Sequence, residues 1–324
     1  MPPTVSPEAI LKELGELWVA LGAGDEAGVL RACAMTLIIA ADEEEEAGVL
    51  GEMIAGIMHD HPSRAIVLRV RDGSDPDIES RVLAQCWMPF GRRQQICCEQ
   101  IEIMASETGL EDVPRIVLGV MAPDLPVVLV CRSPKLFCLP AFQPLLSVAG
   151  KVIVDSRCAS EPRKMLARIA SLRQLGHSIH DLAWTALTPW REVIAGAFDD
   201  RATLSHLHEL HHVSIKGGKR GPGPEVWYLG AWLLRGLDLE TGIELADGET
   251  DVPVQAVELR GEGLNLSFFR DSRTVIRFVR GDVAANLPFT VSSDWELMRE
   301  ELALPGKDSV FEEILPRAMA LAGG

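Results

Sequence analysis

The chain has 324 residues, of which 47% are hydrophobic and 24% are charged, a composition typical of a folded protein long enough for two domains. Its formal net charge of −16 argues against sequence-independent binding to nucleic acid, which requires a basic surface, and against binding to anionic membranes. We therefore expect neither nucleic acid nor membrane as a partner.

The N-terminus and the cysteines predict a cytoplasmic protein. The first residues, MPPTVSPEAILKEL, lack the basic and then apolar segments of a secretory signal. The most apolar stretch, residues 116–131, is interrupted by Pro123, Asp124 and Pro126, so it is too short to span a bilayer. Seven cysteines, an odd number without compact spacing, are typical of free thiols in a reducing compartment.

The first half of the chain alternates helical and extended patterns. Apolar residues recur at helical spacing over 7–21, and the run 31–41 predicts a buried strand. Asp42 is a candidate N-cap for a helix ending near Met58, with Glu43–Glu46 in its first turn. Further strands are expected at 63–72, 78–87, 94–105, 124–132 and 151–156, and further helices at 112–121 and 141–149.

This alternation predicts an N-terminal α/β domain with a mixed, partly parallel sheet. The second half has a helical pattern over 161–175, a Gly/Pro-rich basic loop over 216–224 and a helical pattern over 225–237. Strand patterns follow at 252–260, 263–271 and 274–281, and a last helix near 309–321. This order predicts a C-terminal α+β domain, and we place the domains at 1–160 and 161–324.

Residues 180–200, HDLAWTALTPWREVIAGAFDD, place Trp184 and Trp190 close together in a chain with only 5% aromatic residues. Thr188 and Pro189 predict the N-cap and first residue of a helix. An apolar stripe at helical spacing then runs through Trp190, Val193, Ile194, Ala197 and Phe198. The stripe indicates that Trp190 belongs to a core or an interface, and the pattern leaves that choice open.

Three cysteines lie on two strand patterns that we expect to pair. If 78–87 and 94–105 form a hairpin centred near Gly91, Cys86 lies opposite Cys97 or Cys98. Opposed Cβ atoms lie about 4.5–5.5 Å apart, slightly wider than the ~3.8 Å of a disulfide, so a small adjustment would allow a reversible bridge. The alternative is that all three are small buried hydrophobic residues.

One histidine motif formally matches a zinc-dependent hydrolase. His208, Glu209 and His212 satisfy the pattern H-E-x-x-H, which on a helix places two zinc ligands beside a general base. Here the surrounding leucines recur every three residues, and the VSIK that follows indicates a strand. We therefore favour a solvated connector and predict no metal.

Two glycine-rich stretches resemble nucleotide-binding patterns without their context. GAGDEAG, residues 22–28, is preceded by a helix and followed by a strand, the reverse of a dinucleotide-binding turn. KGGKRG, residues 216–221, lacks the Ser or Thr that follows Gly-Lys in a phosphate-binding loop. A sugar-phosphate or nucleotide sensor thus stays an alternative that no motif supports, and we predict no cofactor.

Several segments, in order, resemble the OpcA family, the glucose-6-phosphate dehydrogenase assembly proteins. They are RACAMTLII (31–39), HPSRAIVL (61–68), ICCE (96–99), DLPVVLV (124–130), VIVDS (152–156) and DLAWTALTPWRE (181–192). The last is similar to the family signature D-L-x-W-x-x-L-T-P-W-R. The arrangement of Cys86 with Cys97 and Cys98 is similar to the cyanobacterial branch.

The resemblance implies a non-catalytic allosteric activator that binds glucose-6-phosphate dehydrogenase and promotes its active oligomer, at the start of the oxidative pentose phosphate pathway. It implies partner contacts by the signature residues, which are Asp181, Trp184, Thr188, Pro189, Trp190 and Arg191. In the cyanobacterial branch it also implies coupling to cellular redox state through Cys86, Cys97 and Cys98, with thioredoxin as a candidate partner.

Overall fold

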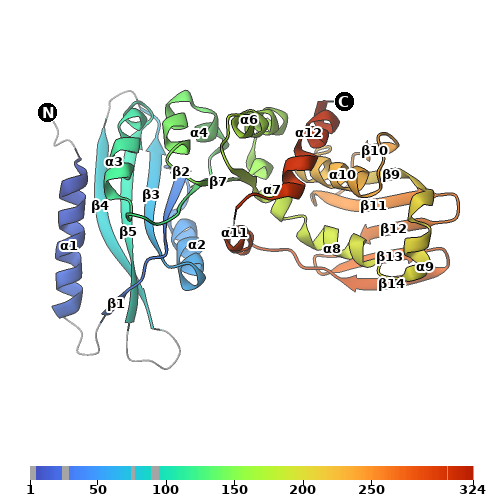
Figure 1. Cartoon of the computed structure of the whole chain (residues 1–324), viewed down its shortest axis with the longest axis horizontal. Coiled ribbons are helices and arrows are strands. Elements are labelled where there is room, and N and C mark those ends of the chain that lie inside the picture. The colour runs from blue at the N-terminus through green and yellow to red at the C-terminus, as the bar shows by residue number, and fades with distance from the viewer. Residues whose placement is uncertain (1–4, 24–28, 74–76, 89–94, 305, 324) are drawn as a thin grey trace. The chain divides into compact units, whose positions relative to one another are not determined.

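The computed structural model describes residues 5–23, 29–73, 77–88, 95–304 and 306–323 (Figure 1). The chain folds into two compact units. The first unit is Met1–Asp155 with Leu172–His180, and the second is Ser156–Ser171 with Asp181–Gly324. The domain boundary at residue 160 stays a prediction.

The first unit contains a sheet of eight strands in the order β1-β5-β3-β2-β6-β7-β8, with β4 added beside β5. The strands are β1 Val29–Arg31, β2 Met35–Asp42, β3 Ser63–Arg71, β4 Ile78–Trp87, β5 Gln95–Ser106, β6 Val127–Cys131, β7 Lys151–Val154 and β8 Ile179–Asp181. The registered pairs are parallel except β4 with β5, which is antiparallel. The central strands β2 and β3 are almost continuously buried and apolar, as parallel strands covered on both faces are.

Helices cover both faces of this sheet. They are α1 Pro7–Ala23, α2 Ala47–Asp60, α3 Val113–Val120, α4 Pro134–Cys138 and α5 Gln143–Leu146, with 3₁₀ turns at Thr108–Glu111 and Pro140–Phe142. The residues of α6 Pro162–Gln174 are divided between the two units. The indole of Trp18 on α1 donates to Glu99 of β5, whereas the ring of His59 on α2 contacts that of Trp87 on β4 in a tilted arrangement. Trp87 lies on the same face as Ile96, with which it pairs across the two strands. Successive residues of β5 face opposite sides, so Glu99, three residues after Ile96, points to the other face. Helices α1 and α2 therefore lie on opposite faces.

The acidic run before α2 differs from the prediction. Asp42 ends β2, and α2 begins only at Ala47, with Glu46 as an N-cap that makes no side-chain hydrogen bond. The prediction that Asp42 caps the helix is therefore wrong. Tertiary contacts explain the difference, because Arg69 donates to the carbonyls of Glu43 and Glu45 and holds the run in a turn.

The second unit contains a six-stranded sheet in the order β10-β9-β11-β12-β13-β14. Its strands are β9 Leu210–Gly217, β10 Ile243–Ala246, β11 Val254–Gly261, β12 Asn265–Arg270, β13 Val275–Arg280 and β14 Val283–Pro288. All neighbours are antiparallel except β9 with β10, which are parallel. The predicted α/β class is thus confirmed, with a largely parallel sheet in the first unit and a mixed sheet in the second.

Helices of the second unit include the tryptophan segment. They are α7 Leu182–Thr185, α8 Thr188–Gly196, α9 Arg201–Ser205, α10 Pro224–Gly236, α11 Asp294–Ala303 and α12 Ser309–Gly323, with 3₁₀ turns at Ser156–Cys158 and Leu207–Glu209. Helix α10 packs against β9 and α12 and is buried along most of its length. Strands β10 and β14 and helix α11 were not predicted from the sequence. The mostly exposed strand β14 gives no apolar alternation that would mark it.

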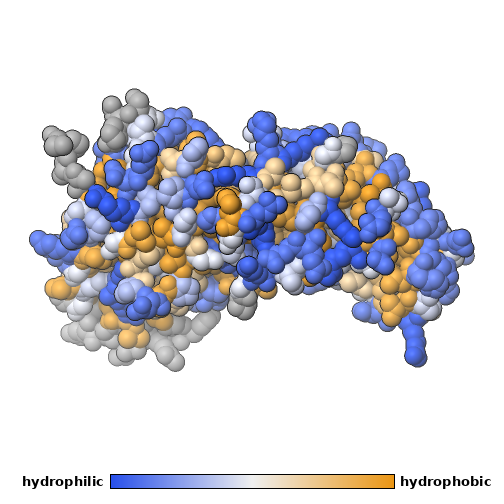
Figure 2. Space-filling view, turned by 45° about the horizontal axis from the view of Figure 1, so that its top comes forward, coloured by the Kyte–Doolittle hydropathy of each residue, from blue (hydrophilic) through white to orange (hydrophobic). Residues whose placement is uncertain are grey.

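On the face drawn in Figure 2, hydrophilic side chains predominate and apolar ones gather in patches between them, as on the surface of most folded proteins. Among the described residues, every helix is too short or too polar to cross a bilayer.

Candidate functional site

Asp181, the first residue of the signature, is a buried carboxylate at the start of α7. It is 1% exposed, and its oxygens accept hydrogen bonds from the N–H groups of Ser156 at 3.0 Å and Ala183 at 3.1 Å. The hydroxyl of Tyr228, on α10, donates to the other oxygen at 2.7 Å. Asp181 thus caps α7 and ties it to α10 within the second unit.

Trp184 and Arg191 form a stacked pair. Trp184 is 3% exposed, and its indole N–H donates to Asp308 at 2.8 Å. The guanidinium of Arg191 lies 3.7 Å from the centre of the Trp184 ring, a cation–π contact that is stronger away from water. Burial lowers the pKa of Arg191, while the nearby carboxylates of Asp308 and Glu300 act in the opposite direction.

Thr188 has a different role from the predicted one. It is the first residue of α8, and Leu187 occupies the N-cap position, so the predicted cap is wrong. The Thr188 hydroxyl instead donates to Glu300 of α11 at 2.7 Å and accepts a hydrogen bond from Arg191 at 2.8 Å. The Thr188 hydroxyl, which was expected to cap α8, is therefore bound by the carboxylate of Glu300 on α11. Pro189, predicted as the first helical residue, is the second, a position that likewise requires no intrahelical N–H.

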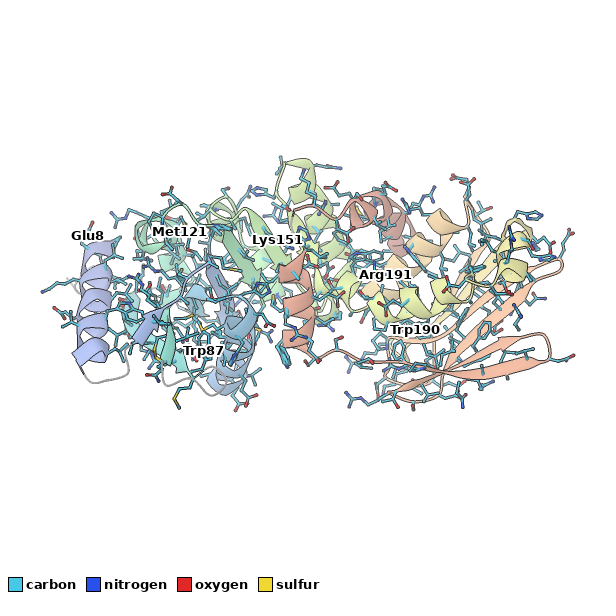
Figure 3. The ribbon with its side chains drawn as sticks, turned by 60° about the horizontal axis from the view of Figure 1, so that its bottom comes forward. Glu8, Trp87, Met121, Lys151, Trp190 and Arg191 are labelled. Atoms are coloured by element: carbon cyan, nitrogen blue, oxygen red, sulfur yellow. A yellow bond between two sulfur atoms is a disulfide. The ribbon has the colours of Figure 1, made fainter. Side chains whose placement is uncertain are left out.

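Trp190 lies in the interior of the second unit. It is 3% exposed and contacts Phe289 edge-to-face, with ring centroids 5.5 Å apart. Trp190 and Arg191 are adjacent on α8 (Figure 3) and make different contacts. Both tryptophans of the signature are therefore core residues of this unit, and neither indole presents a sizeable area to a partner.

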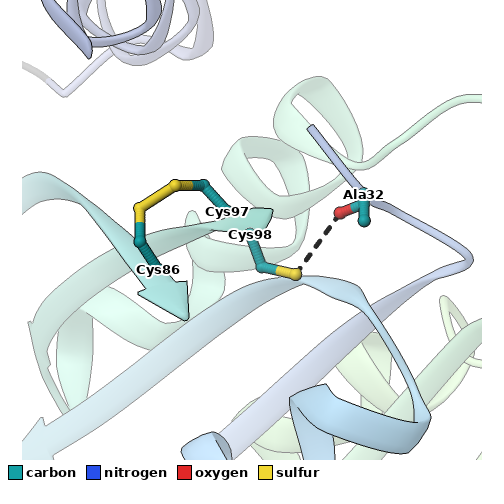
Figure 4. Close-up of a disulfide and its surroundings, with 4 residues drawn as sticks. All are labelled: Ala32, Cys86, Cys97 and Cys98. Carbon is teal, nitrogen blue, oxygen red and sulfur yellow. Dashed lines mark hydrogen bonds between the residues drawn. A yellow bond between two sulfur atoms is a disulfide. The ribbon is translucent and has the colours of Figure 1, made fainter. Parts of the chain in front are cut away.

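Cys86 pairs with Cys97 in a disulfide between β4 and β5 (Figure 4). The two residues are directly opposite in the antiparallel register, with their Cα atoms 4.1 Å apart. Cys98 points to the other face, where its thiol contacts the carbonyl of Ala32 at 3.4 Å. Burial raises the pKa of Cys98 to about 11. The structure thus selects Cys97 over Cys98 as the partner of Cys86. The predicted turn centred near Gly91 lies outside the described residues.

A buried ion cluster lies on the same face as the disulfide. Glu99, two residues after Cys97, accepts from Arg64 and Arg31 at 2.5 Å each and from the indole of Trp18 at 2.6 Å. The cluster joins α1 to the strand that carries Cys97. It was not predicted, because an acidic residue within an apolar strand pattern does not reveal its partners.

The zinc motif is divided between two elements. His208 and Glu209 lie in a 3₁₀ turn, and His212 lies in β9, so the two histidines are not one helical turn apart. Glu209 accepts a hydrogen bond from the N–H of Gly263 at 2.9 Å, and His212 lies 3.8 Å from Glu244. Within the described part of the chain, no group of three His, Cys, Asp or Glu side chains is placed to hold a metal ion.

Of the two glycine-rich stretches, the structure describes the basic loop in full and the first stretch only in part. Residues 24–28 of the first stretch lie outside the described residues. In the basic loop, Lys216 pairs with Glu249 at 2.9 Å and Lys219 with Asp251 at 2.8 Å. These lysines are therefore neutralised within the second unit.

The fold and these sites define a two-unit α/β protein with a cross-strand disulfide in one unit and a buried Trp-Arg pair in the other. Two family models match it in chain order. Residues 55–171 match the glucose-6-phosphate dehydrogenase subunit N-terminal domain, and residues 177–315 match the corresponding C-terminal domain. The chain belongs to the OpcA family.

Curated relatives come from cyanobacteria. The OxPP cycle protein OpcA of Synechocystis is 31% identical over 173 residues, which are 52% of this chain and 36% of the relative. The OpcA protein of Nostoc punctiforme is 28% identical over 196 residues, 59% of this chain and 42% of the relative. The chain therefore spans less than half the length of these relatives.

Among solved structures, biliverdin reductase of Synechocystis aligns over 89% of this chain and 97% of its own, with a TM-score of 0.48 and 11% identity. A similarity of this size carries no functional inference.

Proposed function

We propose that this protein is a non-catalytic assembly factor that binds glucose-6-phosphate dehydrogenase and favours its active oligomer. The observation that carries the proposal is the match of two consecutive family models, both described as parts of a glucose-6-phosphate dehydrogenase subunit. An assembly factor can shift an oligomerisation equilibrium only if it binds the active form more tightly than the inactive form.

The signature residues divide into two groups, one that holds the helices in place and one that is exposed to a partner. Asp181, Trp184 and Trp190 are buried, so we assign them to holding α7, α8 and α10 in place. Thr188, Pro189 and Arg191 are partly exposed on the first turn of α8. These three present the part of the signature that is available to the dehydrogenase.

The test is an assay of the cognate dehydrogenase with and without this protein. We expect higher activity and a larger oligomer by size-exclusion chromatography in the mixture. Replacement Arg191→Gln should weaken activation, whereas Arg201→Gln, at an exposed position of α9, should leave it intact. If activity, substrate affinity and oligomer size are all unchanged by the wild-type protein, the proposal fails.

We further propose that thioredoxin reduces the Cys86–Cys97 disulfide and thereby adjusts activation. The cytoplasmic location stays a prediction, and in that compartment disulfides are usually transient or redox-sensing. A thioredoxin thiolate attacks the sulfur of Cys86, which is partly exposed, whereas Cys97 is fully buried. The S–S bond breaks, Cys97 leaves as a thiolate and takes up a proton, and the second thioredoxin thiol resolves the mixed disulfide. Thioredoxin supplies both electrons and ends as its own disulfide.

Cysteine variants test the redox proposal. We expect activation by the wild-type protein to differ between thioredoxin-reduced and oxidised samples. The double variant Cys86→Ser/Cys97→Ser should not respond, and Cys98→Ser should respond like the wild type because Cys98 is outside the disulfide. A response that persists in the double variant would contradict this role.

A further inference from the structure

The second unit has a cavity of about 500 Å³ beside Trp190. Trp190 of α8 and Phe289, which follows β14, form an aromatic wall. Small-molecule sites typically occupy about 300–1,000 Å³ and combine apolar walls with a few polar groups. The cavity therefore has the size and lining of a ligand site.

Two arginines at the end of β12 give this cavity its charge. Arg270 is half-buried, and Arg273 follows it in the turn before β13. Within the described residues, neither has a carboxylate partner: Arg270 donates only to the carbonyl of Ser272 at 3.4 Å and lies 5.2 Å from the Phe289 ring. In a chain with 47 acidic and 31 basic residues, two neighbouring arginines without carboxylates are unexpected.

Other arginines of the same hairpin are paired. Arg277 pairs with Asp271 at 3.1 Å, and Arg280 pairs with Asp200 at 2.8 Å. Asp271 is adjacent to Arg270 in the chain but its carboxylate binds Arg277. Among the described residues of the hairpin, the arginines that lack a carboxylate partner are therefore the two that line the cavity, Arg270 and Arg273.

The remaining charges leave the cavity with a positive balance. Asp251, on its wall, is bonded to Lys219, and Arg157, also on the wall, pairs with Asp294 at 3.2 Å. Glu225 is the other acidic wall residue, and it lies in the first turn of α10. Burial and the charge of Arg273 lower the pKa of Arg270. The wall thus carries three arginines against two carboxylates, one of which is bonded to Lys219, so a bound anion would offset the remaining positive charge and stabilise the site.

We propose that this cavity binds the phosphate monoester of a small metabolite. Arg270 and Arg273 hold the phosphate group, whose two negative charges match two guanidinium groups and whose oxygens accept bidentate hydrogen bonds. Thr290 and Ser292 line the same cavity and bring further hydroxyl groups. The carbon skeleton of the ligand lies against Trp190 and Phe289. This inference is independent of the proposed association with the dehydrogenase.

Calorimetric titration of the full chain tests the proposal without any dehydrogenase. The probes are glucose 6-phosphate, AMP, inorganic phosphate and the unphosphorylated glucose and adenosine. We expect at least one phosphate ester to bind at least about tenfold more tightly than its unphosphorylated counterpart, the size of effect that a charge-assisted hydrogen bond gives. A preference for glucose 6-phosphate or for AMP supports the site in either case and identifies a sugar phosphate or a nucleotide as its ligand.

Matched variants locate the binding. Arg273→Gln, at an exposed position, should weaken binding of the preferred ester at least about tenfold, because it removes one of two phosphate-binding groups. Arg260→Gln, at an exposed position of β11 outside the cavity lining, should not. Equal melting temperatures of the two variants show that both are folded. The proposal is overturned if no probe binds at millimolar concentration, if phosphate brings no gain in affinity, or if the two variants lose affinity equally.

Discussion

Buried polar residues explain why the signature segment keeps its geometry. Asp181 accepts hydrogen bonds from Ser156, Ala183 and Tyr228, which belong to three different parts of the second unit. Trp184 of α7 likewise donates a hydrogen bond to Asp308 before α12, and Arg191 of α8 lies over the Trp184 ring. At this scale the segment is a structural junction whose rigidity shapes the neighbouring surface.

Replacement Asp181→Ala should reduce the free energy of unfolding of the second unit by about 3 kcal/mol, because it leaves buried donors without an acceptor. Urea unfolding followed by tryptophan fluorescence measures the loss. Asp199→Ala, at an exposed position shortly after α8, should change stability by no more than about 0.5 kcal/mol. If both variants unfold at the same urea concentration, Asp181 does not hold the junction.

Accessibility and thiol pKa predict which cysteines react. In the oxidised protein at pH 8, iodoacetamide should label exposed Cys138 and leave Cys98 unmodified, as read by mass spectrometry. The pKa of Cys98 is raised to about 11, so its thiolate fraction is small at this pH. Rapid labelling of Cys98 at pH 8 would contradict this burial.

The raised pKa of Cys98 also makes stability depend on pH. Because the folded state holds the thiol proton of Cys98 more tightly than the unfolded state, the associated stabilisation is complete below about pH 9 and is lost as the pH rises toward 11.

At the scale of elements, α1 is attached to the first unit by a charged cluster as well as by apolar packing. Glu99 of β5 is surrounded by Arg64, by half-exposed Arg31 and by the indole of Trp18. Ile10 and Leu14 supply the buried apolar face of the helix. Disruption of the cluster should therefore affect the strand that carries Cys97 as well as α1.

Glu99→Leu should destabilise the first unit by about 3–5 kcal/mol, because it leaves the buried guanidinium of Arg64 without a counter-charge. The double variant Glu99→Leu/Arg64→Met should recover much of this loss, since it removes both buried charges. Chemical denaturation measures both values. Glu79→Gln, at an exposed position of β4, serves as the control with little expected effect. A double variant no more stable than Glu99→Leu would rule out this explanation.

At the scale of the whole molecule, the chain forms two compact units, and its one disulfide among the described residues belongs to the first. Reduction should therefore act on one unit selectively. A disulfide stabilises chiefly by restricting the unfolded chain, and for a short loop the effect is about 2–3 kcal/mol.

Hydrogen exchange with and without reductant tests this selectivity. We expect lower protection in β4 and β5 after reduction and unchanged protection in β11–β13 of the second unit. The variant Cys86→Ser/Cys97→Ser should resemble the reduced protein and show no further change with reductant. Equal loss of protection in both units would contradict the assignment of the disulfide's effect to the first unit.

Much of the fold follows from local patterns. The apolar runs of β2 and β3 and the amphipathic spacing of α1 mark these elements directly, because a buried strand and a surface helix each impose a repeating apolar pattern. The hairpin of β4 and β5 likewise placed Cys86 opposite two candidates. Exposed β14 and the glutamates before α2 were not predictable in this way, since other parts of the chain determine their conformation.

The sequence by itself determined the class of fold, the family and the set of cysteines and tryptophans that merit attention. Only the tertiary structure decided that Cys97, and not Cys98, meets Cys86, because pairing depends on the strand register. It also decided that Trp184 and Trp190 are buried and that Arg270 and Arg273 share a cavity with Trp190. Such relations join residues far apart in the chain, and their energies depend on distances and burial that no local pattern contains.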